Sequence, residues 1–392
     1  MRLSDRVSQM EESVTLAASA RAKALKAEGR DILSLTLGEP DFVTPKNIQD
    51  AAIASIQDGK ASFYTVASGL PELKDAISTY MQNFYGYSVN RNEVVVGTGA
   101  KFILYAFFAT VLNPGDEVII PTPCWVSYVD QVKMVDGVPV TFPTTEDNHF
   151  KATVEQLEAA RTDKTKVLLL NSPSNPTGMV YGKDELQAIG DWAVEHGILI
   201  LADDIYGRLV YNGNEFTAIS SLSDAIRKQT IVINGVSKTY AMTGWRVGFA
   251  VGEPDIIAGM AKVISQTTSN LTAVSQYAAI EALTGDQSSI EEMRQAFEER
   301  LNTIYPLLAE VPGFEVVKPQ GAFYLFPNVK KAMEIKGYTD VTAFTTAILE
   351  EAEVALVTGA GFGAPENVRL SYATDLDTLK EAVRRIKAFM EK

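Results

Sequence analysis

The sequence predicts an α/β fold: a large domain with a mostly parallel central sheet flanked by helices, and a smaller α+β domain formed from both ends of the chain. Short apolar runs alternate with longer amphipathic stretches between residues 93 and 252. Runs such as 167–171 and 198–204 are apolar almost without a break, which is typical of strands buried on both faces of a parallel sheet. The 392 residues are also too many for one compact unit.

The predicted elements follow in a regular order. After about residue 254 come long helical stretches, including 289–311, and then a shorter region of strands and helices. We expect an N-terminal arm and part of the small domain in residues 1–45, including a helix around 17–28. The large domain should span 46–300 and the rest of the small domain 301–392, with the boundary near residue 300 inside a helix. Predicted strands occupy 93–99, 117–121, 138–142, 167–171, 198–204, 231–235 and 245–252, and predicted helices 100–112, 125–135, 153–161 and 183–196.

Composition excludes several classes of function. The net charge of -14, from 35 basic and 49 acidic residues, argues against a nucleic-acid partner. Cys124 is the only cysteine and the chain has two histidines, so we expect no intrachain disulfide and no metal site. The chain starts without an apolar leader and contains no apolar run of membrane-spanning length, so we expect a cytoplasmic protein.

Two polar motifs follow predicted strands at their carboxyl ends, where such sheets bind ligands. Residues 97–101 (GTGAK) join a strand to a helix, so their backbone N–H groups can hold a phosphate. Phe102 replaces the third glycine of a dinucleotide fingerprint, and taken alone the stretch is a plain turn. Residues 171–178 (NSPSNPTG) predict a rigid loop in which Asn175 donates a hydrogen bond, or else a structural turn.

Three charged side chains stand in apolar surroundings. Asp203 ends the run 198–204, and its burial would be costly unless a cation such as a pyridinium N–H paired with it; a helix cap or metal ligand is the alternative. Lys238 lies in the stretch 235–248 (GVSKTYAMTGWRVG). A desolvated lysine beside a cation becomes a nucleophile for an aldehyde, although a solvated lysine is commoner. Arg369, in the run 368–373, requires an anion, which can equally be a substrate carboxylate or an internal acidic group.

Together these stretches resemble the fold-type I pyridoxal-phosphate aminotransferases of the aspartate aminotransferase family, above all its bacterial subgroup Ib. The similarity runs from about Ser13 to the C-terminus. Any one motif is weak or moderate support, but together they are highly specific. In the family's order, they are LTLGEPDFVTP, YTVASGLPELKDAI, GTGAK, NSPSNPTG, DDIY, SKTYAMTGWRVG and VRLSYA.

The resemblance implies a role for each matching residue around pyridoxal 5'-phosphate. Lys238 would bind the cofactor's aldehyde carbon, Asp203 would keep the pyridine nitrogen protonated, and Trp125 would stack on the ring. Tyr206 and Asn175 would hydrogen-bond the ring's phenolic oxygen. The phosphate would be held by Gly99, Ala100, Ser237 and Arg246, with Tyr64 from the neighbouring subunit and Lys101 close by.

The implied reaction transfers the amino group of L-aspartate to 2-oxoglutarate in two half-reactions. Arg369 would bind the substrate α-carboxylate, assisted by the Gly38 backbone, Trp125 and Asn175. Lys101 would bind the distal carboxylate unless it is merely a solvated residue of its helix, and Ser13 and Thr15 would close over the substrate. Because Tyr64 crosses between subunits, the resemblance implies a homodimer.

Alternatives stay open at this level. An aromatic amino acid or alanine aminotransferase would use the same scaffold, and a lyase of the same fold would use the same lysine. A cofactor-sensing transcription regulator would need a winged-helix domain and a basic surface. A nicotinamide-dependent dehydrogenase lacks its glycine fingerprint here. Three departures from the family pattern, at Cys124, Asp204 and residues 207–211 (GRLVY), bear on substrate preference more than on cofactor binding. Cys124 is interpreted as a small core residue.

Overall fold

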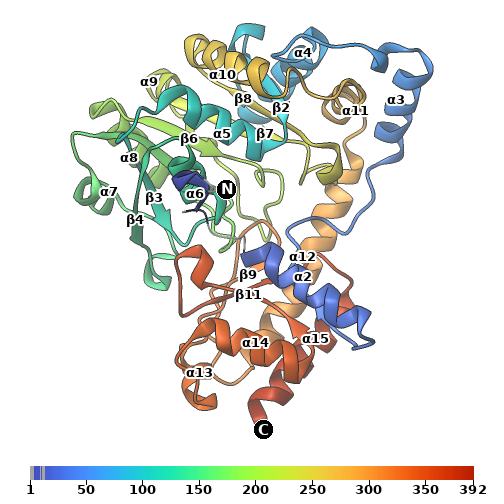
Figure 1. Ribbon diagram of the computed structural model, residues 1–392, viewed down its shortest axis with the longest axis vertical. Helices are drawn as coiled ribbons and strands as arrows, with labels where there is room; N and C mark the ends of the chain where they lie inside the picture. The colour runs from blue at the N-terminus through green and yellow to red at the C-terminus, as the bar shows by residue number, and fades with distance from the viewer. Residues whose placement is uncertain (1–3, 9, 11–13) are drawn as a thin grey trace.

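The computed structural model describes residues 4–8, 10 and 14–392 (Figure 1). The central sheet has seven strands in the spatial order β2-β8-β7-β6-β5-β3-β4. β8 is antiparallel to both of its neighbours, and the other pairs are parallel, so the mostly parallel sheet predicted from the sequence is confirmed. The strands are β2 (Val94–Thr98), β3 (Glu117–Thr122), β4 (Val138–Pro143), β5 (Thr165–Asn171), β6 (Leu199–Asp203), β7 (Thr230–Gly235) and β8 (Val247–Val251).

Helices cover both faces of this sheet, because alternate side chains of each strand are apolar and point to opposite faces. In β6, Leu201 packs into the core on one face, while Ile200 and Ala202 pack into the core on the other. The first face is covered by α5 (Ala100–Val111), α6 (Ser127–Met134) and α10 (Pro254–Thr267). The second is covered by α4 (Pro71–Tyr80), α7 (Val154–Ala160), α8 (Lys183–Glu195), α9 (Asp224–Gln229) and α11 (Ala273–Thr284), with α3 (Lys46–Gln57) packed on α11.

A smaller layer combines the two ends of the chain (Figure 1). β1 (Leu33–Ser34) pairs in parallel with β10 (Val354–Ala355). β11 (Val357–Thr358), β12 (Val368–Ser371) and β9 (Tyr324–Leu325) form an antiparallel sheet in that order. The surrounding helices are α2 (Val14–Ala27), α13 (Lys330–Lys336), α14 (Val341–Ala352) and α15 (Leu376–Glu391), while α1 (Asp5–Ser8) packs against α6.

The long helix α12 (Ser288–Ala309) runs between the two layers, and residue 300 lies inside it (Figure 1). Its apolar side chains, such as Phe297 and Leu301, belong to the core of the smaller layer. The division of the chain at residues 45 and 300 stays a prediction. Among the helices of the described residues, none is both long and apolar enough to cross a bilayer.

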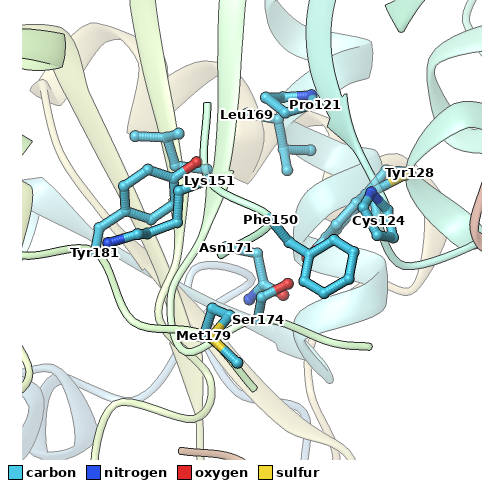
Figure 2. A pocket seen from close by; sticks show the side chains of 12 residues that line it. Pro121, Cys124, Tyr128, Phe150, Lys151, Leu169, Asn171, Ser174, Met179 and Tyr181 are labelled. Atoms are coloured by element: carbon cyan, nitrogen blue, oxygen red, sulfur yellow. The ribbon is translucent and has the colours of Figure 1, made fainter. Parts of the chain in front are cut away.

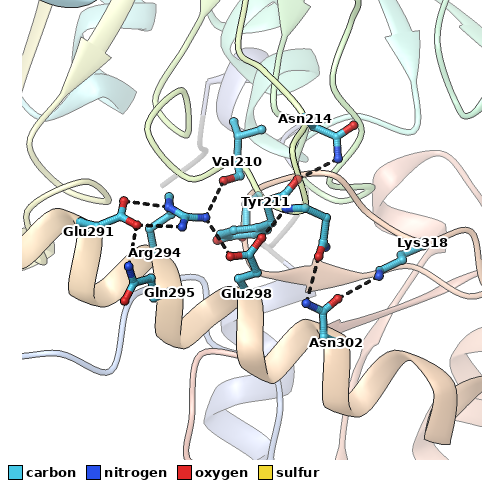
Figure 3. A network of polar contacts seen from close by, with 11 residues as sticks. Val210, Tyr211, Asn214, Glu291, Arg294, Gln295, Glu298, Asn302 and Lys318 are labelled. Carbon is cyan, nitrogen blue, oxygen red and sulfur yellow. Dashed lines mark hydrogen bonds and ion pairs between the residues drawn. The ribbon is translucent and has the colours of Figure 1, made fainter.

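A polar network fastens α12 to the loop that follows β6 (Figure 3). Arg294 donates to the Glu298 carboxylate at 3.1 Å and to the Val210 carbonyl at 3.3 Å. Close by, the backbone N–H of Gln320 donates to the carbonyl of Gly178 at 2.9 Å. The loop carrying Asn175 is therefore held against the segment that leads into β9.

Candidate active site

A cavity of about 430 Å³ lies at the carboxyl ends of β5, β6 and β7, beside the smaller layer. The register of the parallel strands sets Asn171 at the end of β5 opposite Asp203 at the end of β6, which brings distant motifs to one edge. Gly99 and Tyr64 are not among the lining residues, and Ser13 lies outside the described residues. Of the side chains singled out in the sequence, the cavity is lined by Thr15, Gly38, Ala100, Lys101, Trp125, Asn175, Asp203, Tyr206, Ser237, Lys238, Arg246 and Arg369.

Asp203 is a buried carboxylate at the cavity wall, 3% exposed. It lies on the same face of β6 as Leu201, so it points toward α6, where the Tyr128 hydroxyl donates to it at 2.7 Å. Burial raises the pKa of Asp203 to about 6, against the opposing effects of the Tyr128 and Ile205 hydrogen bonds. A buried carboxylate with one hydroxyl donor is poised to accept a cationic N–H donor.

Lys238 follows β7 and lines the same cavity. Its Nζ donates to the Gly38 carbonyl and lies 6.0 Å from the centre of the Tyr206 ring. Burial lowers the pKa of Lys238 to about 8, partly opposed by Glu39 and reinforced by Arg246. An amine with this pKa has a much larger neutral fraction near pH 7 than an ordinary lysine, and the neutral form is what a nucleophile or base requires.

The amino end of α5 forms an anion-binding corner. Gly99 caps the helix with φ +82°, and the first turn leaves backbone N–H groups without intrahelical acceptors. A Cβ at Gly99 would lie 2.5 Å from Nη2 of Arg246, so the glycine permits this close approach. Arg246 is fixed by donation to the Thr243 carbonyl at 2.9 Å, and the buried Ser237 lines the cavity beside it.

Arg369, in β12, is 1% exposed, and one of its three nitrogens has no hydrogen-bond partner among the described residues. Its Nη1 donates to Asn175 Oδ1 at 3.0 Å and its Nη2 to the Thr36 carbonyl at 2.9 Å, while Nε has no partner within the described residues. Among the described residues, no carboxylate forms a hydrogen bond or ion pair with Arg369. A buried guanidinium with an unused N–H is suited to a ligand carboxylate.

Lys101 lies at another part of the cavity wall, in the first turn of α5. Its Nζ is 4.8 Å from the centre of the Trp125 ring, which holds the ammonium by a cation–π contact. Partial burial, followed by repulsion from Arg246, lowers the pKa of Lys101. Thr15, in the first turn of α2, also lines the cavity, and its hydroxyl has no hydrogen-bond partner among the described residues.

Several lining residues were missed in the sequence. Tyr128 supports Asp203, and Tyr324 has its hydroxyl 2.8 Å from that of Tyr206. Both lie in stretches with apolar neighbours, so their patterns predict core packing. Thr36 binds Arg369 through its backbone carbonyl, which no side-chain pattern reveals.

A second hollow of about 30 Å³ adjoins the cavity (Figure 2). Tyr128 and Asn171 line both spaces. The size of the second hollow suits one or two water molecules by the usual ~10–15 Å³ criterion. Cys124 also lines this hollow, is 7% exposed and has its pKa raised to about 12 by burial. A second departure from the family pattern, Asp204, does not line the cavity and accepts a hydrogen bond from the Tyr85 hydroxyl at 3.0 Å.

Comparison with known proteins decides the family. The model of the family "Aminotransferase class I and II" matches residues 30–386. The chain is a class I and II aminotransferase. It belongs to the fold-type I enzymes of the aspartate aminotransferase family, and it is a transaminase that uses pyridoxal phosphate.

Individual relatives cover essentially the whole aminotransferase chain. The asparagine–oxo-acid transaminase of Streptococcus mutans is 77% identical over 391 residues, and the alignment covers 100% of each chain. The aspartate aminotransferase of Bacillus subtilis is 52% identical over 392 residues, again with 100% of each covered. The solved structure of the Thermus thermophilus aspartate aminotransferase with maleate has a TM-score of 0.94 and 38% identity, covering 99% of this chain and 100% of that one.

The cavity of this aminotransferase fits pyridoxal phosphate on chemical grounds. Asp203 offers a buried anion for the pyridinium N–H, and the amino end of α5 with Arg246 offers donors for the phosphate. Lys238 offers an amine of lowered pKa for the aldehyde. The pyridinium N–H and the phosphate therefore each have a partner of opposite charge on this wall.

Proposed function

We propose that this aminotransferase transfers the amino group of L-aspartate to 2-oxoglutarate. The observation that carries the proposal is that Arg369 and Lys101 line one cavity, so that a basic group is available for each carboxylate of a dicarboxylic amino acid. The dicarboxylate maleate accompanies the related T. thermophilus enzyme, and the B. subtilis relative is named an aspartate aminotransferase. The net charge of -14 makes such local cations necessary for an anionic substrate.

The proposed roles of the residues follow from their chemistry. Bound pyridoxal phosphate supplies the electron sink that weakens the Cα–H bond of the amino acid. Lys238 would hold the cofactor, and its amine in the neutral form would take the Cα proton of the amino acid and later give it back, acting as base and then as acid. Asp203 stabilises the protonated ring nitrogen. Arg369 orients the α-carboxylate, assisted by Asn175.

L-Asparagine is the second candidate substrate. The relative that is 77% identical is named an asparagine–oxo-acid transaminase. The Lys101 ammonium can donate to an amide oxygen as well as to a carboxylate. The two substrates differ in how much they depend on the charge of Lys101, since the ammonium attracts the full negative charge of a carboxylate but only the dipole of an amide.

We also propose a homodimer in which Tyr64 serves the neighbouring site. Tyr64 is 91% exposed and does not line the cavity of its own chain. Phe63 and Val66 beside it are 75% and 57% exposed, so an apolar patch surrounds it. The cytoplasmic location stays a prediction.

The experiment is an absorption spectrum of the purified holoenzyme on addition of L-aspartate, L-asparagine or L-alanine, followed by 2-oxoglutarate. We expect aspartate to bleach the cofactor band and 2-oxoglutarate to restore it. Lys101→Gln should lower kcat/KM for aspartate by about tenfold to a hundredfold and leave alanine unchanged, because a charge-assisted bond is worth about 1.5–3 kcal/mol. Lys133→Gln is the matched control, since Lys133 is exposed on α6 and lies outside the cavity lining.

The outcomes separate the candidates. If asparagine bleaches the band and aspartate does not, the second candidate replaces the first. Equal losses for aspartate and alanine in Lys101→Gln would contradict the role given to Lys101. A band that responds to neither four-carbon amino acid would refute both substrates.

A further inference from the structure

Tyr324 is a fully buried tyrosine whose hydroxyl contacts a residue of the proposed active site. It belongs to β9, has 0% exposure and lines the cavity. Its hydroxyl lies 2.8 Å from the hydroxyl of Tyr206, at a distance where one of the two must donate. Neither the sequence motifs nor the roles proposed above use this residue.

The direction of this hydrogen bond decides what Tyr206 can offer a ligand. If Tyr206 donated to Tyr324, the Tyr324 proton would find no acceptor among the described residues, and Tyr206 could only accept a hydrogen bond from a ligand in the cavity. If Tyr324 donates, both buried hydroxyls are used, and Tyr206 keeps its proton for an acceptor in the cavity.

The surroundings favour Tyr324 as the donor. The guanidinium carbon of Arg369 lies 4.4 Å from the centre of the Tyr324 ring. Burial raises the pKa of both hydroxyls and Arg369 opposes the effect at both, but the hydrogen bond with Tyr206 lowers the pKa of Tyr324, while Tyr324 helps to raise that of Tyr206 well above its usual value. The more acidic hydroxyl of a pair is the better donor.

We propose that Tyr324 is a positioning residue that donates its hydroxyl proton to Tyr206, so that the Tyr206 proton is directed at the phenolic oxygen of the cofactor. The inference rests on the proposed role of Tyr206. The ring of Tyr324 also makes a cation–π contact with Arg369. Tyr324 therefore contacts both Tyr206, which is proposed to bind the cofactor, and Arg369, which is proposed to bind the substrate carboxylate.

The test is a pH titration of the cofactor absorption band in the holoenzyme. A hydrogen bond to the phenolic oxygen favours its ionised form, so weakening that bond should raise the midpoint of the spectral transition. We expect Tyr324→Phe to raise the midpoint by about half a pH unit, and Tyr206→Phe to raise it further. KM for the amino acid should stay within about twofold in Tyr324→Phe, because the ring against Arg369 is retained.

Tyr372→Phe is the matched control. Tyr372 is also buried, at 1% exposure, and donates to the Ala322 carbonyl at 3.2 Å without lining the cavity. Its loss should leave the spectral midpoint at the wild-type value.

Three outcomes are informative. If Tyr206→Phe shifts the midpoint while Tyr324→Phe matches Tyr372→Phe, the inference about Tyr324 is wrong and the role of Tyr206 stands. If Tyr206→Phe leaves the midpoint unchanged, the proposed role of Tyr206 fails first. If Tyr324→Phe does not fold, Tyr206→Phe and the double variant replace it; the inference requires these two to share one midpoint, and a difference would overturn it.

Discussion

Asp203 and Lys238 are both held where burial opposes their charge. The pKa of Asp203 is raised to about 6 and that of Lys238 is lowered to about 8. At neutral pH, Asp203 is therefore still ionised inside an apolar wall, and Lys238 releases its proton more readily than a surface lysine. A ligand that places a cation beside Asp203 would offset the free-energy cost of burying its negative charge.

The cost at Asp203 leads to a prediction about stability. The folded pKa of about 6 exceeds the ordinary value of 3.8, so the folded protein gains stability as pH falls from 6 toward 3.8 and lacks that gain above 6. Asp203→Asn should therefore stabilise the cofactor-free protein by about 1–3 kcal/mol at pH 8, with a smaller effect at pH 5. Urea unfolding at both pH values measures this, and an equal effect at the two would contradict it.

The sequence was informative about charged site residues and silent about their supports. A carboxylate that ends an apolar strand, such as Asp203, can be recognised from the sequence because its neighbours in the run are apolar. Tyr128 and Tyr324 do not, because a tyrosine among apolar residues has the same pattern whether its hydroxyl reaches a ligand or the core. The carbonyl of Thr36 is invisible for a different reason, since every residue has one.

At the scale of elements, the amino end of α5 depends on one backbone conformation. Gly99 has φ +82°, and a Cβ there would meet Arg246 at 2.5 Å. Gly115, in the turn after the same helix, has φ +88° with nothing within 4 Å of a Cβ. The two glycines share the backbone requirement and differ only in what a methyl group would displace.

This pair gives the second prediction. Gly99→Ala and Gly115→Ala should each lose about 1 kcal/mol of stability from backbone strain. Only Gly99→Ala should also weaken cofactor binding, by about tenfold or more, because Arg246 must move. Titration of the stripped proteins with pyridoxal phosphate compares them. An unchanged affinity of Gly99→Ala for pyridoxal phosphate would contradict the assignment of Arg246 and the amino end of α5 to the phosphate site.

The strands of the central sheet could be predicted closely, since β2 to β7 lie within a few residues of their apolar runs. The opposite direction of β8 could not. Its residues are buried on both faces, and such a run carries no sign of which way the chain enters the sheet. The order of strands likewise depends on helix packing across the sheet, which no single run encodes.

At the scale of the whole molecule, the exposed Tyr64 makes the proposed dimer testable by mixing subunits. Tyr64→Ala dimers should bind cofactor weakly, and Lys238→Ala dimers should be inactive. A hybrid dimer would combine the intact Lys238 of one subunit with the intact Tyr64 of the other. One complete site should form per hybrid, giving about half of the wild-type activity at limiting cofactor.

Differently tagged subunits, co-expressed and purified through both tags, provide the hybrids. If Tyr64 acted within its own chain, the one site with an intact Lys238 would carry the Tyr64→Ala substitution. The hybrid would then show no gain in activity over the two parent variants. A monomer by analytical ultracentrifugation would reject the arrangement outright.

The burial of Cys124 has a practical consequence. A chain with a single thiol, 7% exposed and with a pKa raised to about 12, presents almost no thiolate to reagents in solution. Cysteines introduced on α15 of the smaller layer and on α10 of the larger one would then be the positions that a maleimide dye or spin label modifies. Pairs of such labels, one on each layer, would report how far the two layers move while the unlabelled residues of the cavity stay native.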